Sequence, residues 1–126
     1  MIKLINTEKA PGAVGPYSQG VEIGNLIYTS GQLPIDMSTN KLIIDDIKQA
    51  TKASMDNLKA ILEEAGSDLD HLVKTTIFVT DINDFETINE IYASYFEEHK
   101  PARSLVEVSK LPKGANIEIE GIASKK

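Results

Sequence analysis

The strongest structural signals in the chain are residues 46–66, DIKQATKASMDNLKAILEEAG, and the apolar stretch at residues 73–79, VKTTIFV. Apolar residues in the first stretch recur at the i, i+3, i+4, i+7 spacing of an amphipathic helix. Asp46 is the expected N-cap of that helix, and Gly66 is the expected residue just beyond its C-terminus. The second stretch is short and rich in β-branched residues, which is typical of a strand. A helix followed closely by a buried strand predicts a layer of helix on sheet.

The rest of the chain supplies more strands and a second helix. Gly24-Asn25 is a two-residue turn signal between apolar runs, so a hairpin is expected there. The second helix is expected to start at Asn83 or Asp84 and to end before Pro101. The other expected strands are residues 2–6, 21–23, 26–29, 103–108 and 116–123, with residues 33–44 extended. The order β-β-β-α-β-α-β-β predicts an α+β domain with two helices on one face of a mixed sheet.

Length, composition and charge limit the class of protein. The 126 residues suit one domain, expected across residues 1–126. The chain has no cysteine, and His71 and His99 lack partners at metal-ligand spacing, so no metal site is expected. The formal net charge of −6 argues against a nucleic-acid partner. Residues 1–6 are too short an apolar run for a signal peptide or membrane span, so we expect a cytoplasmic protein with no membrane partner.

The last two expected strands suggest that one sheet face needs a cover. We assume that the loop between these strands centres near Leu111-Pro112. One alternate set of side chains, which includes the charged residues, then falls on one face, and the apolar set packs on the helices. The residues that then share one face are Arg103, Leu105, Glu107, Glu118 and Glu120. The earlier strands leave apolar side chains on the face without helices. A second subunit is the expected cover.

Arg103 and Glu118 are the two candidate catalytic residues. Arg103 begins an expected strand, and a guanidinium can bind a carboxylate through two parallel hydrogen bonds. The alternative is a strand-surface arginine paired with Glu118 or Glu120. The Glu118 carboxylate could hold or deprotonate a water molecule. The alternative for both glutamates is a solvated strand face.

Four other residues are candidates for substrate contacts. Ser30 has no neighbour in the sequence that would activate it as a nucleophile, so a hydrogen-bonding or turn role is expected. Gly31 permits close approach of a ligand to its backbone N–H. Tyr17 is either a loop anchor or a lid over a pocket. Asn89 is either a residue of the polar helix face or a ligand contact.

Five blocks of sequence occur in an order and at spacings that together are specific. They are residues 15–20 (GPYSQG), 28–34 (YTSGQLP), 74–79 (KTTIFV), 101–104 (PARS) with 106–108 (VEV), and 111–113 (LPK) with 117–120 (IEIE). Any one block alone is a weak signal. Together they make the chain similar to the RidA branch of the Rid/YjgF family from about residue 3 to residue 124.

The resemblance implies a chorismate-mutase-like fold and a homotrimer whose three sheets form a central barrel, with a ligand cleft at each subunit interface. It implies hydrolysis of 2-iminobutanoate and 2-iminopropanoate to 2-oxo acids and ammonia without a cofactor or metal. Such an enzyme clears reactive enamine and imine products of pyridoxal-phosphate dehydratases. Carried over by position, Arg103 grips the substrate carboxylate and Glu118 handles the attacking water. The pocket-lining residues carried over are Tyr17, Ser30, Gly31 and Asn89.

One position departs from the pattern of the family. Leu105 stands where many members have a cysteine that lines the cleft, which keeps the pocket apolar and removes a thiol. Two other functions attached to parts of the family stay open as alternatives. One is a regulatory module that binds 2-oxo acids without turnover. The other is a ribonuclease or translation inhibitor, which the net charge and the absence of a basic stripe disfavour.

Overall fold

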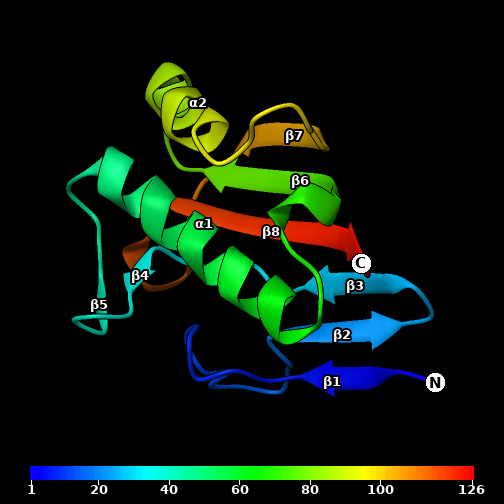
Figure 1. Cartoon of the computed structure of the whole chain (residues 1–126). Coiled ribbons are helices and arrows are strands. Elements are labelled where there is room, and N and C mark those ends of the chain that lie inside the picture. The colour runs from blue at the N-terminus through cyan, green and yellow to red at the C-terminus, as the bar shows by residue number, and fades with distance from the viewer.

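Helix α1 (Ile47–Glu64) lies across one face of the main sheet in the computed structural model, which describes residues 1–126 (Figure 1). It starts where predicted, because the Asp46 carboxylate accepts hydrogen bonds from two backbone N–H groups of the first turn. Such a cap satisfies donors that have no partner inside the helix. Gly66 follows the helix with φ +81°, a left-handed conformation that glycine adopts without strain. Both predicted ends of this helix are confirmed.

Six strands form the main sheet in the order β1-β2-β3-β8-β6-β7. They are β1 (Lys3–Ile5), β2 (Gly20–Ile23), β3 (Leu26–Thr29), β6 (Leu72–Val79), β7 (Ala102–Glu107) and β8 (Ile117–Ser124). Neighbouring strands are antiparallel except β6 and β7, which are parallel. These two are joined through α2 (Phe85–Ala93), the kind of crossover that parallel strands require. The predicted mixed sheet with two helices on one face is confirmed (Figure 1).

The core lies between α1 and the sheet. Leu58, Ile61 and Leu62 of α1 are fully buried against alternate residues of the central strands, including Ile77 and Ile119. The period of the helix and the period of the strand therefore bring their apolar residues to the same layer. Neither α1 nor α2 combines the length and the apolarity that a membrane span needs.

Two local features differ from the sequence prediction. Residues 33–44 are not simply extended, because they form a small separate hairpin of β4 (Ile35–Asp36) and β5 (Lys41–Leu42). The helical segment around α2 begins earlier than predicted, with a 3₁₀ turn at Ile82–Asp84 that the Asp81 carboxylate caps. Asp84 occupies the N-cap position of α2 itself, but its side chain makes no capping bond. Other 3₁₀ turns lie at Leu69–His71 and Pro112–Gly114.

The face that β7 presents to the helices is the reverse of the prediction. Arg103 pairs in register with Thr75 of β6, which pairs with Gly121 of β8, and this row lies on the helix face. The grouping of Arg103, Leu105 and Glu107 with Glu118 and Glu120 is therefore wrong. β6 lies between β7 and β8, so no hairpin sets their relative register, and a shift of one residue moves a strand's side chains to the opposite face.

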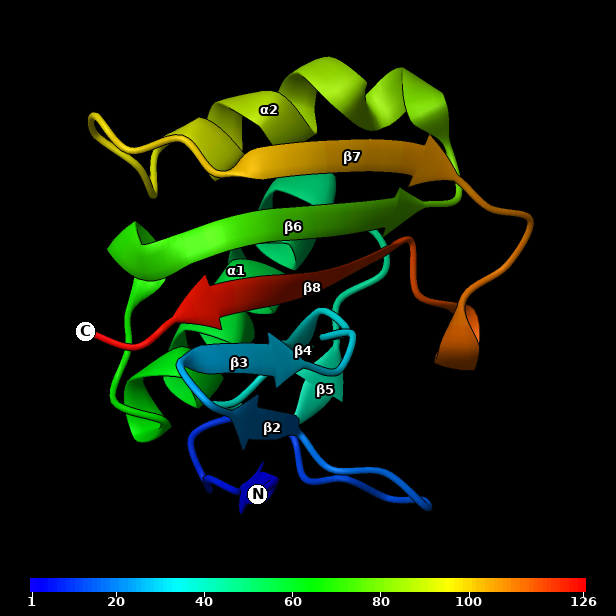
Figure 2. The same cartoon turned by 90° about the vertical axis from the view of Figure 1, so that its right-hand side faces the viewer.

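The second sheet face has no helix over it. Figure 2 looks onto the sheet with α1 behind it. Tyr28 of β3 is 40% exposed on this open face and Val106 of β7 is 43% exposed. Glu118 and Glu120 of β8 lie on the same face, paired in register with Phe78 and Thr76 of β6. The predicted apolar face without a helical cover is present.

Candidate active site

A cavity of about 580 Å³ lies where the loop before β2 approaches the end of β3, β8 and the 3₁₀ turn at Pro112–Gly114. Four of the predicted site residues line it: Tyr17, Ser30, Gly31 and Glu118. Glu120 and Lys113 share its wall. These residues come from positions far apart in the sequence, so the fold assembles them at one end of the sheet.

Gln19 and Ser30 hold the loop that forms one side of this cavity. Gln19 is 2% exposed, and its amide accepts from the N–H of Thr7 at 2.7 Å and donates to the carbonyls of Thr7, Ala10 and Pro11 at 3.0, 3.3 and 2.8 Å. The Ser30 hydroxyl donates to the carbonyl of Ser18 at 2.6 Å. This bond favours the hydrogen-bonding role of Ser30 over that of a nucleophile. Tyr17 is half exposed at the rim.

Gly31 leaves space for the Glu118 carboxylate. A Cβ atom at position 31 would overlap the Glu118 side chain, including its carboxylate oxygen Oε2. Gly31 has no left-handed φ, so the absence of a side chain is what the site requires. Backbone hydrogen bonds between Gln32 and Ile119, at 2.7 and 3.1 Å, fix the two segments beside each other. Glu118 is therefore seated against the backbone of the β3 end.

The environment of Glu118 favours its neutral form. Burial raises the pKa of the Glu118 carboxyl above its ordinary value, and the nearby negative charge of Glu120 raises it further. Arg103 does not offset this repulsion within the chain, because it is on the other face of the sheet. A carboxylate with a raised pKa is a stronger proton acceptor once it is ionised. A partly buried carboxyl with a raised pKa is the kind of group that general-base chemistry uses.

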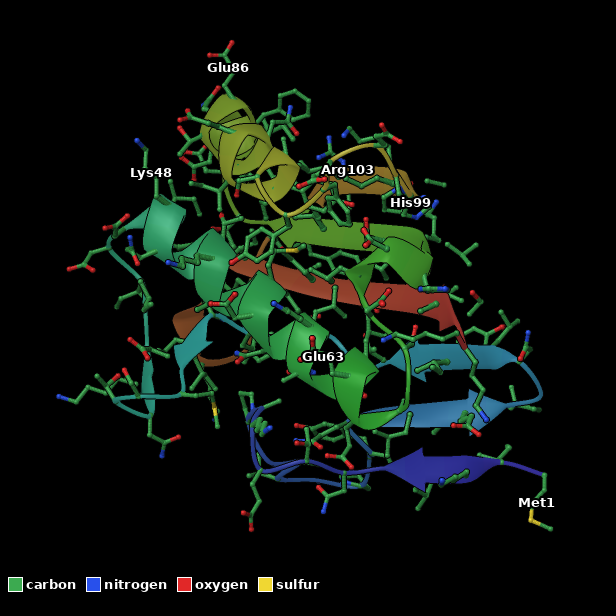
Figure 3. The ribbon with its side chains drawn as sticks, in the orientation of Figure 1. Met1, Lys48, Glu63, Glu86, His99 and Arg103 are labelled. Atoms are coloured by element: carbon green, nitrogen blue, oxygen red, sulfur yellow. The ribbon has the colours of Figure 1, made fainter.

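Arg103 lies on the helix face, away from the Glu118 cavity. Figure 3 shows Arg103 between α2 and β7. Its guanidinium carbon is 5.0 Å from the ring centre of Tyr92 and 5.9 Å from that of Phe85. Arg103 and Asn89 line a separate hollow of about 290 Å³. Within one chain, the structure does not bring Arg103 and Glu118 together.

Leu105 lines neither of these two hollows. It projects from β7 on the same face as Arg103 and packs against the hydrophobic core. Sequence reasoning missed the structural roles of Gln19 and of Phe85 and Tyr92. Gln19 stands inside the GPYSQG block and could have been singled out there. The two aromatics looked like an ordinary apolar helix stripe, and only the pairing of β7 places Arg103 against them.

The two histidines lie near each other, although they are distant in the sequence. His71 and His99 line one hollow at the far end of β6. His71 Nδ1 is 2.6 Å from the Asp68 carboxylate, and His99 Nε2 is 2.6 Å from the carbonyl of Leu72. Each ring therefore has one nitrogen in a local hydrogen bond. No group of three or more His, Cys, Asp or Glu side chains is arranged to hold a metal ion.

Known proteins resemble this chain over nearly its whole length. The family model described as Endoribonuclease L-PSP matches residues 7–125. The 2-iminobutanoate/2-iminopropanoate deaminase of Escherichia coli (strain K12) is 53% identical over 126 residues, which cover 98% of both proteins. A RutC family protein of Pyrococcus abyssi is 53% identical over 123 residues, covering 98% of this chain and 97% of that protein.

A solved structure has nearly the same fold as this chain. The crystal structure of Escherichia coli TdcF with bound serine has a TM-score of 0.93 and 45% sequence identity to this chain, and it covers 98% of this chain and 99% of its own. The match of the family model and the similarity to these relatives extend through every segment that forms the candidate site. The chain belongs to the Endoribonuclease L-PSP family, which is also called the Rid/YjgF family.

Proposed function

We propose that this protein hydrolyses 2-imino acids, such as 2-iminobutanoate and 2-iminopropanoate, to 2-oxo acids and ammonia. The observation that carries the proposal is the partly buried Glu118 carboxylate, seated against Gly31 in a cavity, with a raised pKa. The deaminase name of the Escherichia coli relative at 53% identity supports the same reaction. The bound serine in TdcF shows that this other protein holds a small amino acid.

The reaction needs a positioned water and a proton acceptor. A protonated 2-imino acid is electrophilic at C2. As the water oxygen bonds to C2, the C=N π pair moves to nitrogen and a water proton moves to Glu118. Glu118 then returns that proton to the amino group. As the C–N bond breaks and ammonia leaves, the hydroxyl proton moves to Glu118 and the C–O group becomes the carbonyl of the 2-oxo acid. Ammonia takes this proton from Glu118 and departs as ammonium, so atoms and charge balance without a cofactor. Glu118 acts first as general base and then as general acid.

Arg103 is the proposed carboxylate clamp, and its position supports a site shared between two copies of the chain. Arg103 and Glu118 project from opposite faces of one sheet, so one substrate molecule does not reach both within a chain. The open apolar face offers a surface for another copy. We propose a chorismate-mutase-like homotrimer in which three sheets form a central barrel. Each cleft then combines Arg103 and Asn89 of one copy with Tyr17, Ser30, Gly31 and Glu118 of the next.

The proposed physiological role is the removal of reactive enamines and imines released by pyridoxal-phosphate-dependent dehydratases. The single domain spans residues 1–126 in this proposal. A chain without cysteine fits a reducing compartment such as the cytoplasm. Leu105 keeps its surroundings apolar.

A coupled assay tests the proposed reaction directly. A dehydratase generates 2-iminobutanoate in situ, and the decay of the imine is followed with and without the purified protein. The proposal expects faster decay that is proportional to protein concentration. The Glu118→Gln variant is the matched control, because it is nearly isosteric and cannot accept the proton. Decay at the uncatalysed rate with the wild-type protein overturns the proposal.

Sedimentation equilibrium tests the proposed assembly. A trimer at micromolar concentration is expected, with more than about 1,000 Å² buried in each subunit contact. A monomer under these conditions removes both the barrel and the shared cleft.

RNA cleavage is a second candidate because the family model carries an endoribonuclease description. The cavity wall holds Glu118 and Glu120, which repel a phosphate backbone, and the net charge of the chain is −6. Cleavage activity that co-purifies with the protein through successive columns and is lost in Glu118→Gln favours this candidate. Binding of 2-oxobutanoate without any imine hydrolysis favours a sensing module instead.

A further inference from the structure

The Arg103 guanidinium has aromatic neighbours and no acidic partner. The three ion pairs of the chain involve other residues, and no side-chain hydrogen bond of the chain involves the guanidinium. A half-buried cation usually pairs with a carboxylate or a carbonyl. Here the guanidinium carbon lies over the ring of Tyr92 at 5.0 Å and over that of Phe85 at 5.9 Å. Both distances fall within the range of a cation–π interaction.

The Tyr92 ring is itself held in place. Tyr92 is 7% exposed, and its hydroxyl is 2.8 Å from the hydroxyl of Thr75, a fully buried residue of β6. Its other neighbour is the Phe96 ring, with 5.0 Å between ring centres. Thr75 also pairs in register with Arg103. Thr75 therefore contacts both β7, which carries Arg103, and the Tyr92 ring, which lies against the guanidinium.

Phe85, the first residue of α2, is the second aromatic neighbour of the Arg103 guanidinium. It is 41% exposed, so its ring contributes little to the core. A large apolar side chain that is exposed at the first residue of a helix and lies against an arginine is better explained by that contact than by burial. Phe85 and Tyr92 are seven residues apart, two helical turns, so they lie on the same side of α2.

We propose that Phe85 and Tyr92 form an aromatic cradle that positions the Arg103 guanidinium for the carboxylate of the substrate. The inference rests on the proposed role of Arg103 as the carboxylate clamp. Aromatic rings attract the cation through their faces and leave its N–H groups unpaired. An acidic partner would compete with the substrate for those donors. The cradle therefore orders the Arg103 side chain without occupying the N–H groups that bind the ligand. Phe85 and Tyr92 are positioning residues in this account.

A pair of variants at Phe85 separates the ring from the bulk of the side chain. Phe85→Leu removes the π face but stays apolar, whereas Phe85→Tyr keeps the face. Calorimetry with 2-oxobutanoate measures binding to each assembled protein. Phe85→Leu is expected to raise Kd by about 3- to 30-fold, the range of a partly desolvated cation–π contact, and Phe85→Tyr is expected to leave Kd within about twofold. The imine-decay assay is expected to show kcat within about twofold for both variants, because chemistry at Glu118 is untouched.

Tyr95→Leu is the matched control for loss of an aromatic ring near α2. Tyr95 donates its hydroxyl hydrogen to Asp56 of α1 and does not contact Arg103. It is expected to lower stability without raising Kd. Tyr92→Phe keeps the ring and removes the bond to Thr75, so a Kd increase smaller than that of Phe85→Leu is expected.

Adding Arg103→Lys to the series distinguishes failure of the Arg103 clamp from failure of the aromatic cradle. If Arg103→Lys binds 2-oxobutanoate normally, the clamp itself is refuted. If Arg103→Lys loses affinity while Phe85→Leu binds like the wild-type protein, the clamp stands and the cradle is refuted. Equal loss of affinity in Phe85→Leu and Tyr95→Leu also refutes the cradle, because the effect is then a general loss of packing.

Discussion

Arg103 and Glu118 carry different parts of the proposed reaction, so substitutions should separate binding from chemistry. Arg103→Lys keeps the charge but loses the planar fork, and it is expected to weaken 2-oxobutanoate binding by about 2–3 kcal/mol, or about 30- to 150-fold. Glu118→Gln is expected to leave this affinity within a few fold and to lower turnover by roughly 10²–10⁴. Calorimetry measures the first effect and imine decay the second. Normal turnover by Glu118→Gln would transfer the role to Glu120, which lies on the same face.

Adding a single methyl group at Gly31 is expected to lower catalysis. A methyl group there overlaps the Glu118 side chain, so Gly31→Ala must displace the carboxylate or the strand end that faces it. We expect turnover to fall by at least about tenfold, because a general base must stay within hydrogen-bond reach of its water. Gly12→Ala is the control, since no atom lies within 4 Å of a Cβ at that position. Imine decay at the wild-type rate in Gly31→Ala would show that Glu118 need not sit where the structure places it.

Helix α1 illustrates what local sequence predicts well. Its period, its N-cap at Asp46 and its final Gly66 are all encoded within 21 consecutive residues, and the structure has them as predicted. Each signal depends on neighbours along the chain, so no knowledge of tertiary contacts is needed. The small β4–β5 hairpin was missed because each of its strands has only two residues, too few for a period to be recognised.

The Asp46 cap gives α1 a measurable contribution to stability. Asp46→Ala removes the acceptor for two N–H groups of the first turn and is expected to cost about 1 kcal/mol. This corresponds to a thermal midpoint lower by about 3–5 °C in a domain of this size. Asp45→Ala is the control, because Asp45 is exposed and makes no such bond. Equal midpoints for the two variants would contradict the capping role.

Strand β7 illustrates what local sequence does not decide. Its alternation was visible, but the face that each residue takes depends on its pairing with β6, which is contributed by a distant segment. The assumed hairpin with β8 put Arg103 beside the glutamates, and the structure puts it beside Phe85 and Tyr92 instead. The cavity around Glu118 was predictable only from the family blocks, since nothing local to Ser30 or Tyr17 points to Glu118.

The assembled protein is expected to work without a metal. The chain has no cysteine, and no three candidate ligands are arranged for a cation. Exhaustive dialysis against EDTA is therefore expected to leave the rate of imine decay unchanged. Loss of activity that is restored by added zinc, and by no other treatment, would mean that a ligand set forms between copies of the chain.

A cleft shared between two copies of the chain should let two inactive variants restore activity when they are mixed. Arg103→Ala and Glu118→Gln proteins carrying different tags are co-refolded at equal concentration, and mixed oligomers are isolated by both tags. If each site combines Arg103 of one copy with Glu118 of the next, about a quarter of the sites formed by random mixing hold both intact residues. We expect imine decay at about a quarter of the wild-type rate before tag selection, far above either variant alone. Mixed oligomers that are no more active than the separate variants would contradict a site built from two copies.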